Sequence, residues 1–233
     1  MSDKPCWICG DPSGSREHAS KKSDVQLKFP KGTKRHRLFR SDSLRRNRLL
    51  QGANADALKW DVPVCPYCNT TRTQPHDRAW ERLSAWLHAA NPPIRAGSVI
   101  RGDRVFAQHA RRQMLRVHLY FAKQMGCRIL HVQSPIDVAP LATAILGERA
   151  CPELFLTFDK SEDIGIATIQ ISNFPNVSDE FYRVTAQWTY IIDPIAVTLT
   201  YRLAGSTFPL LANSWHPRHG TTRLVLGPIT DQP

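Results

Sequence analysis

The sequence predicts an α+β protein in which an N-terminal cysteine-containing module, a helical connector and a C-terminal β-rich part follow one another. Three observations lead to this prediction: two Cys-x-x-Cys pairs near the start, helical periodicity in the middle of the chain, and several β-branched or aromatic segments in its second half. At 233 residues the chain is long enough for two modest domains. We expect the three parts to cover residues 1–92, 93–126 and 127–233.

The second cysteine pair is expected to lie between a strand and a helix. Every second residue of the segment 57–64 is apolar, which is the pattern of a strand with one buried face. These apolar residues are Leu58, Trp60, Val62 and Val64. Further along, Trp80, Leu83 and Leu87 recur at helical spacing until Asn91-Pro92-Pro93 ends the helix.

The middle of the chain predicts a long amphipathic helix that begins after Asp103 and ends at Gly126. Asp103 is a good N-cap residue and Gly126 a good stop signal, while apolar residues follow one face between them. Arginines occupy the other face, which we interpret as solvated, with a phosphate-contacting surface as the alternative. These arginines are Arg104, Arg111, Arg112 and Arg116.

The last hundred residues predict one short helix followed by a mostly antiparallel sheet. The helix is expected over 139–146, because this stretch is apolar and falls before a run of strand-forming segments. Those segments are rich in β-branched and aromatic residues and are separated by turn residues. They cover residues 154–158, 164–171, 181–192, 195–203 and 223–226.

The positive charge of the chain is concentrated in one segment. The formal net charge is +11, and residues 20–50 contain eleven lysines and arginines against two aspartates, which leaves +9. Residues 20–56 lack clean periodicity, so we expect a long basic loop there, in which the segment 43–51 could form a short helix. Such a charge suits a polyanion and also suits anionic lipid.

Membrane insertion and secretion are not expected. No run of eighteen apolar residues is present, so nothing in the sequence predicts a membrane span. The first residues lead directly into a cysteine pair and lack the apolar core of a secretory signal. We therefore expect a cytoplasmic protein.

Two cysteine pairs predict a structural zinc site. Cys6 with Cys9 and Cys65 with Cys68 have the two-residue spacing that lets both sulfurs of a pair face one tetrahedral ion. A redox pair would be expected in a thioredoxin-like βαβ context, which is absent. The two remaining cysteines, Cys127 and Cys151, lie in apolar stretches and are interpreted as buried thiols.

The order of the polar residues around these pairs resembles a known family. The first pair precedes Glu17-His18, and the second pair is followed at once by Asn69, then by Arg72 and by His76-Asp77 at the start of a helix. This order is similar to the zinc-knuckle class of HNH (ββα-metal) endonucleases, over roughly residues 6–90. The resemblance implies a β-hairpin and helix that clasp one catalytic divalent ion, distinct from the zinc.

The resemblance also implies roles for individual residues. His18 would be the general base, and Glu17 a ligand of a catalytic Mg²⁺ or Mn²⁺, since hard cations prefer carboxylate oxygen. Asn69 would hold the base-bearing strand by hydrogen-bonding its backbone. His76 would be the second metal ligand, with Asp77 as the alternative, because one residue of register separates them. Two features depart from the family: Glu17 stands where aspartate is more common, and the basic insertion is long.

The substrate that this pattern favours is DNA, with RNA as the alternative polymer. Phosphate contacts are expected from the basic segment and from an arginine four positions after Cys68. The expected contact residues are Lys31, Lys34, Arg35, Arg37, Arg40, Arg45, Arg46 and Arg72.

Two other functions fit the same sequence. The chain could be a non-catalytic zinc-ribbon protein that binds nucleic acid, or a nuclease effector whose C-terminal part binds a ligand or a protein. For that C-terminal part, target recognition, formation of a homodimer and control of the nuclease all fit. Metal-dependent cleavage separates the catalytic functions from the non-catalytic one.

Overall fold

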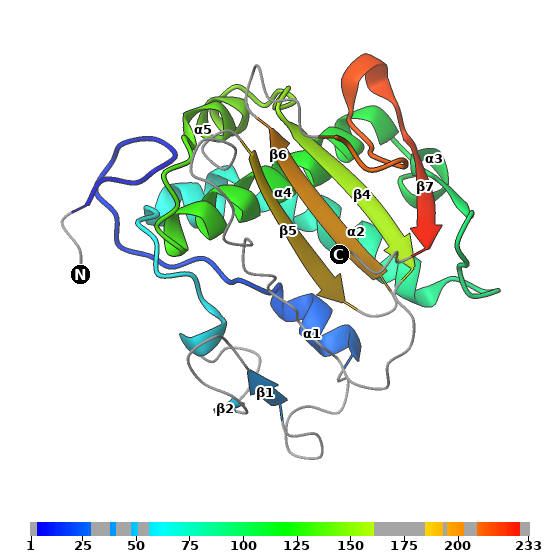
Figure 1. The fold of residues 1–233 in the computed structure, drawn as a ribbon, viewed down its shortest axis with the longest axis horizontal. Helices are drawn as coiled ribbons and strands as arrows, with labels where there is room; N and C mark the ends of the chain where they lie inside the picture. The colour runs from blue at the N-terminus through cyan, green and yellow to red at the C-terminus, as the bar shows by residue number, and fades with distance from the viewer. Residues whose placement is uncertain are drawn as a thin grey trace.

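The computed structural model describes residues 4–28, 38–40, 48–50, 56–160, 185–192, 195–202 and 209–228. Over these residues the protein is a mixed α+β fold, which confirms the predicted class. Figure 1 shows the main sheet with helices stacked behind it. None of the described helices is long and apolar enough to cross a membrane.

A five-stranded sheet in the order β3-β7-β4-β6-β5 forms one layer of the fold. The strands are β3 (Val99–Arg101), β4 (Leu154–Lys160), β5 (Thr185–Ile192), β6 (Ile195–Arg202) and β7 (Arg223–Pro228). All neighbours pair antiparallel except β4 and β7, which are parallel. The mostly antiparallel sheet is therefore confirmed, and one of its strands, β3, comes from the expected connector. The predicted strand over 164–171 lies outside the described residues.

The regular structure of the described chain also includes five α-helices and a small separate ribbon. The α-helices are α1 (Lys22–Lys28), α2 (Gln74–Ala89), α3 (Gly102–Val105), α4 (Ala110–His131) and α5 (Ala139–Leu146). The ribbon is formed by β1 (Leu38–Arg40) and β2 (Arg48–Leu50), and short turns of 3-10 or π-helix cover Asp56–Leu58, Tyr67–Arg72 and Arg218–Gly220. The prediction of α5 is confirmed with its bounds, and α2 contains the predicted helical segment.

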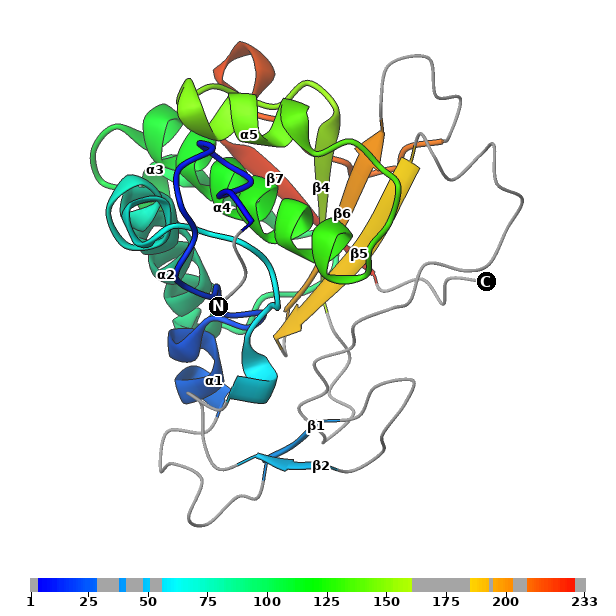
Figure 2. The same cartoon turned by 90° about the vertical axis from the view of Figure 1, so that its left-hand side faces the viewer.

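Helix α4 is the centre of the molecule. It lies between the sheet on one side and α2 with the N-terminal segment on the other (Figure 2). From Val117 to Ile129 every residue is buried, including Lys123, Gln124 and Arg128. The predicted one-sided amphipathic helix is therefore wrong for this stretch, because both faces of the helix are covered. Only its N-terminal turns keep an arginine-bearing exposed side.

The predicted bounds of this helix are also corrected. It begins at Ala110, because His109 has a left-handed backbone with φ of 54° that separates it from the short α3. It continues through Gly126 to His131. A Cβ atom at Gly126 would overlap the indole ring of Trp7, so the glycine permits close packing of the N-terminal segment instead of ending the helix.

The expected long loop over residues 20–56 contains regular structure. Helix α1 and the β1–β2 ribbon both fall within it, and β2 occupies part of the segment 43–51, where a short helix was predicted. Tertiary contacts explain α1: the buried Asp24 carboxylate accepts hydrogen bonds from Trp80 Nε1 at 2.7 Å, Ser84 Oγ at 2.7 Å and Tyr190 Oη at 2.6 Å. Sequence periodicity contains no signal for contacts of this kind.

The apolar core of the described chain is continuous. It runs from Cys6 in the N-terminal module to Leu226 in the last strand, and it includes residues of each of the three predicted parts. Aromatic rings link the layers: Trp80 of α2 stacks on Tyr120 of α4 and meets Tyr190 of β5 edge-on. The N-terminal module is therefore packed onto the rest of the fold through α4.

A buried histidine in α4 predicts acid sensitivity. His118 Nε2 accepts a hydrogen bond from the Cys151 amide at 3.1 Å, and burial lowers the pKa of His118 to about 3. The unfolded chain binds this proton near pH 6.5, so the free energy of unfolding should fall as pH drops from 6.5 towards 3. We expect a loss of about 3 kcal/mol between pH 6.5 and pH 4 from this group, measured by urea unfolding. His118→Gln, which keeps an acceptor, should show a flatter slope; equal slopes would contradict the assignment.

Candidate functional site

Four cysteines form a cluster that can hold a metal ion. The sulfur atoms of Cys6, Cys9, Cys65 and Cys68 all lie within 4.8 Å of one another, and Cys9 Sγ is 3.6 Å from Cys65 Sγ. A tetrahedral zinc with Zn–S bonds of about 2.3 Å places its sulfurs roughly 3.8 Å apart, so the cluster fits this ion. None of the six cysteines forms a disulfide. The structure therefore confirms that the four predicted cysteines converge into one cluster suited to a structural metal such as zinc.

Backbone hydrogen bonds join the two cysteine-bearing segments into a short antiparallel ladder, formed by residues 15–19 and 58–64. Its bridges pair Ser15 with Val64 and His18 with Lys59, and the Trp60 amide donates to the Glu17 carbonyl at 2.7 Å. The four alternating apolar residues of 58–64 are buried, as their spacing predicted, but the segment forms isolated bridges and not the regular strand that was expected. This ladder places Glu17 near the start of α2, to which its carboxylate is linked through Lys123.

The side chain of Asn69 holds the backbone of the ladder at Arg16. Its side-chain Nδ2 donates a hydrogen bond to the Arg16 carbonyl at 3.2 Å, directly before Glu17. The π-helical turn Tyr67–Arg72 carries both Cys68 and Asn69 and leads into α2. A side-chain contact to the backbone at this position is the one that the resemblance implied for Asn69.

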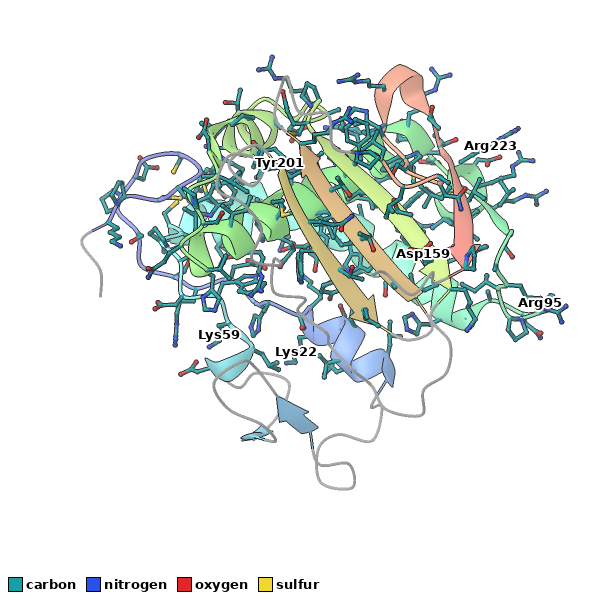
Figure 3. The ribbon with its side chains drawn as sticks, in the orientation of Figure 1. Lys22, Lys59, Arg95, Asp159, Tyr201 and Arg223 are labelled. Atoms are coloured by element: carbon teal, nitrogen blue, oxygen red, sulfur yellow. The ribbon has the colours of Figure 1, made fainter. Side chains whose placement is uncertain are left out.

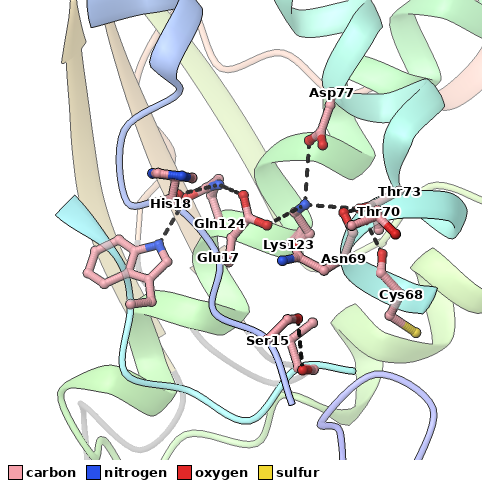
Figure 4. A network of polar contacts seen from close by, with 12 residues as sticks. Ser15, Glu17, His18, Cys68, Asn69, Thr70, Thr73, Asp77, Lys123 and Gln124 are labelled. Atoms are coloured by element: carbon pink, nitrogen blue, oxygen red, sulfur yellow. Dashed lines mark hydrogen bonds and ion pairs between the residues drawn. The ribbon is translucent and has the colours of Figure 1, made fainter. Parts of the chain in front are cut away.

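Glu17 meets the start of α2 through a buried lysine, as Figure 4 shows. Lys123 Nζ lies 2.7 Å from Glu17 Oε2 and 2.9 Å from Thr73 Oγ1, to which it donates a hydrogen bond. Its distance to Asp77 Oδ1 is 3.4 Å, an ion pair without hydrogen-bond geometry. Lys123 is 0% exposed and Glu17 is 6% exposed. The ladder, α2 and α4 therefore share one buried ionic cluster.

The charges of this cluster are matched by protein groups. Lys21 Nζ lies 3.2 Å from Asp77 Oδ2, so each of the two carboxylates has an ammonium partner. Burial alone would lower the pKa of Lys123, but the Glu17 and Asp77 carboxylates outweigh it and raise this pKa well above its ordinary value. Lys123 is therefore a permanent cation at neutral pH.

A catalytic divalent ion does not fit between Glu17 and Asp77 as the side chains stand. The two carboxylates converge across the gap between ladder and helix, but Lys123 Nζ occupies the space where such an ion would bind both. The sequence pattern did not single out Lys123, since it stands outside the stretch that resembles the family. The available signal was a lysine within an apolar run, between Ala122 and Met125.

Of the two proposed ligands at the start of α2, Asp77 is the one that faces Glu17 across Lys123. His76 is completely buried, and neither ring nitrogen has a hydrogen-bond partner among the described residues. Burial, with a contribution from Lys123, lowers the pKa of His76 to about 4, so its ring is neutral near pH 7.

His18 lies on the other side of the ladder from Glu17. Adjacent residues in an extended segment point to opposite faces, and Figure 4 shows its ring directed away from Lys123. The side chain is partly exposed, and Figure 3 shows Lys22 and Lys59 on this side of the molecule. Burial, together with Lys59, Lys21 and Lys22, lowers the pKa of His18 below 6.5. A neutral imidazole next to basic side chains can accept a proton near a phosphate.

The predicted phosphate contacts are described only in part. Arg72 lies at the end of the π-helical turn, with its guanidinium 5.3 Å from the centre of the exposed Tyr67 ring. Arg40 belongs to β1, of which the backbone alone is described. The remaining predicted contacts lie outside the described residues: Lys31, Lys34, Arg35, Arg37, Arg45 and Arg46.

Comparison of the chain with protein-family models, with curated proteins and with solved structures finds no match. The role of the site therefore rests on the chain's own geometry. That geometry comprises a four-cysteine cluster able to hold zinc, a ladder anchored by Asn69, and two carboxylates that share one buried cation.

The cysteine cluster predicts loss of metal and of folding in a single variant. Cys65→Ser removes one thiolate from the cluster, and a structural zinc of this kind contributes on the order of 10 kcal/mol to folding. We expect zinc content, measured by atomic absorption, to fall from about one per chain to a small fraction, with loss of cooperative unfolding. Cys151→Ser changes a buried thiol outside the cluster and should keep its zinc. Equal zinc contents would contradict the site.

Proposed function

We propose that the chain is an endonuclease that hydrolyses phosphodiester bonds of DNA, with His18 as the general base. The observation that carries this proposal is the placement of adjacent residues on the ladder. Glu17 is buried and its carboxylate is held by Lys123 and Gln124 of α4, while His18 faces partly outward among lysines. This is the arrangement expected of a base beside a carboxylate centre in the family that the sequence resembles.

The chemistry assigned to His18 is proton transfer. Its neutral ring would take a proton from water as the water oxygen attacks phosphorus, and the P–O bond to the leaving oxygen would break. Lys22 and Lys59 would offset part of the negative charge of the phosphate on this side of the ladder, with the Lys59 ammonium shared with Asp56. Asn69 would hold the base-bearing segment in register through the Arg16 carbonyl.

A bound Mg²⁺ or Mn²⁺ would supply Lewis-acid stabilisation of the phosphate charge. The residues proposed to hold it are Glu17 and Asp77, and both are engaged by ammonium groups of the protein. We therefore assign no step of the reaction to this ion. Zinc would remain structural, because a four-thiolate site has no open position for substrate.

A nucleic-acid partner is favoured by the charge of the chain. The net charge is +11, and the basic segment 20–50 is inserted between the two halves of the ladder, next to His18. Such a segment neutralises phosphates without reading bases, so it supports binding to DNA or RNA and implies no sequence preference. We propose DNA as the substrate. Cleavage of RNA in place of DNA would identify RNA as the substrate instead.

A second function is favoured by one specific observation. Lys123 fills the space between Glu17 and Asp77, which is what a non-catalytic zinc-containing nucleic-acid-binding protein would show. In that case the cluster would serve only to hold α4 against the ladder and α2. Plasmid DNA incubated with purified protein in Mg²⁺, Mn²⁺ or chelator separates the two functions. Binding without cleavage in any divalent ion would favour the second.

Replacing the proposed base should abolish turnover and leave binding intact. His18→Ala should reduce plasmid nicking by roughly 10²-fold or more, because it removes the proton acceptor. The substitution leaves every residue of the ionic cluster in place, so the fold should not change. Zinc content and DNA affinity should stay at the parental level. His109→Asn is the matched control, since His109 is exposed and its left-handed backbone tolerates asparagine. Parental nicking by His18→Ala would show that the base is assigned wrongly.

The inserted basic segment should determine the salt dependence of binding. Arg35→Ala combined with Arg37→Ala should weaken DNA binding and reduce the slope of log affinity against log salt by about 0.9 for each phosphate that is no longer neutralised. Arg95→Ala combined with Arg223→Ala removes the same charge at two positions away from Lys22 and Lys59 (Figure 3) and should change the slope less. Filter binding at several salt concentrations measures both. An identical slope in the two double variants would exclude the segment from the interface.

A further inference from the structure

Gln124 of α4 joins both halves of the ladder through three hydrogen bonds. Its side chain is 0% exposed, and its Nε2 donates to Glu17 Oε1 at 3.2 Å and to the His18 carbonyl at 3.1 Å (Figure 4). Its Oε1 accepts a hydrogen bond from Trp60 Nε1 at 3.0 Å. One buried amide therefore contacts the segment that carries the proposed base and the segment paired with it.

Trp60 fixes the orientation of this amide. An indole N–H can only donate a hydrogen bond, so the oxygen of Gln124 faces Trp60 and its NH₂ group faces the ladder. Trp60 is itself completely buried and packs edge-on against Trp188 of β5, with ring centroids 5.7 Å apart. Core packing therefore holds the two donors of Gln124 towards Glu17 and His18.

The carbonyl groups on either side of Glu17 need partners from outside the ladder. The Glu17 carbonyl is bonded to the Trp60 amide, and successive carbonyls of an extended segment point to opposite edges. The Arg16 and His18 carbonyls therefore both point away from the paired segment. A backbone carbonyl that is removed from water requires another donor.

Side-chain amides are the donors at both positions. Asn69 donates to the Arg16 carbonyl at 3.2 Å, and Gln124 donates to the His18 carbonyl at 3.1 Å. The first contact is the one that the resemblance implied, whereas Gln124 stands outside the stretch 6–90 that carries the resemblance. Gln124 therefore makes the same kind of contact as Asn69, two residues further along the ladder.

We propose that Gln124 is a positioning residue for His18: its amide fixes the backbone of the proposed base relative to Glu17 and to the other half of the ladder. The inference rests on the proposed function, in which His18 is the base, and adds a residue that touches no substrate. Misplacing a reacting group by about 1 Å costs up to roughly 10²-fold in rate. Loss of this contact should therefore lower turnover and leave DNA binding unchanged.

Gln124→Glu tests the proposal with a side chain of the same size. A carboxyl group still accepts from Trp60, but it has at most one donor, which the charged Glu17 carboxylate takes in preference to the His18 carbonyl. We expect the nicking rate at saturating plasmid to fall at least roughly tenfold, with KM at the parental level. Gln124→Met is the second variant, because it removes all three hydrogen bonds without adding a carboxyl group.

Nuclear magnetic resonance tests the contact with His18 in the absence of DNA. The sequence contains three His-Ala pairs, beginning at His18, His88 and His109, so ¹³C in histidine carbonyls and ¹⁵N in alanine amides give three signals. The His18 signal should shift in both Gln124 variants, because its carbonyl loses its donor, and the other two signals are internal references. Gln187→Met is the matched control: it removes a side-chain hydrogen bond within the sheet and should move no signal and keep the parental rate.

The two measurements separate the possible failures. A His18 signal that moves in neither Gln124 variant would overturn the inference, whether or not the chain cuts DNA. A shifted signal with the parental rate per folded molecule would also overturn it, because Gln124 would then be merely structural, and would leave the proposed function intact. If the parent does not nick DNA, the proposed function fails and the signal alone decides: a shift supports the hold on His18, and an unchanged signal refutes it.

Discussion

The pairing of Lys123 with Glu17 and Asp77 is the interaction on which the arrangement of the site depends. Helix α4 is buried on both faces, and a lysine at its centre would be untenable without two carboxylates. Those carboxylates come from the cysteine-bounded ladder and from α2, so one ionic cluster fixes the N-terminal module against the core. The cysteine cluster supplies the other constraint, since it ties the two halves of the ladder together across the basic insertion.

The parts of the fold that the sequence predicted are those encoded by local patterns. Alternation over 58–64 identified a buried face, helical spacing after Trp80 identified α2, and cysteine spacing identified the metal cluster. The hydrogen bond from Asn69 to the Arg16 carbonyl also agrees with what the resemblance implied. The alternation and the helical spacing are each encoded within one short segment, whereas the cysteine cluster and the Asn69 contact join residues more than fifty positions apart.

The features that the sequence did not predict depend on partners far away in the chain. Helix α1 is held by Asp24, whose three hydrogen-bond donors lie on α2 and β5. Gly126 resembles a helix stop, but it is a packing position under Trp7. Lys123 stands in an apolar run, but only the fold of the distant ladder and of α2 shows that its partners are Glu17 and Asp77. The apolar periodicity of a single segment cannot predict contacts between residues that are far apart in the chain.

The state of the Lys123 ammonium tests the central claim most directly. In zinc-loaded protein with ¹⁵N-labelled lysine and without added divalent ion, nuclear magnetic resonance should detect one ammonium group that is protected from exchange. Carboxylate pairing raises its pKa, so this group should stay charged above the pH at which exposed lysines titrate. The signal should be lost in Lys123→Arg. A lysine spectrum without a protected ammonium, or one in which that group titrates like an exposed lysine, would contradict the account.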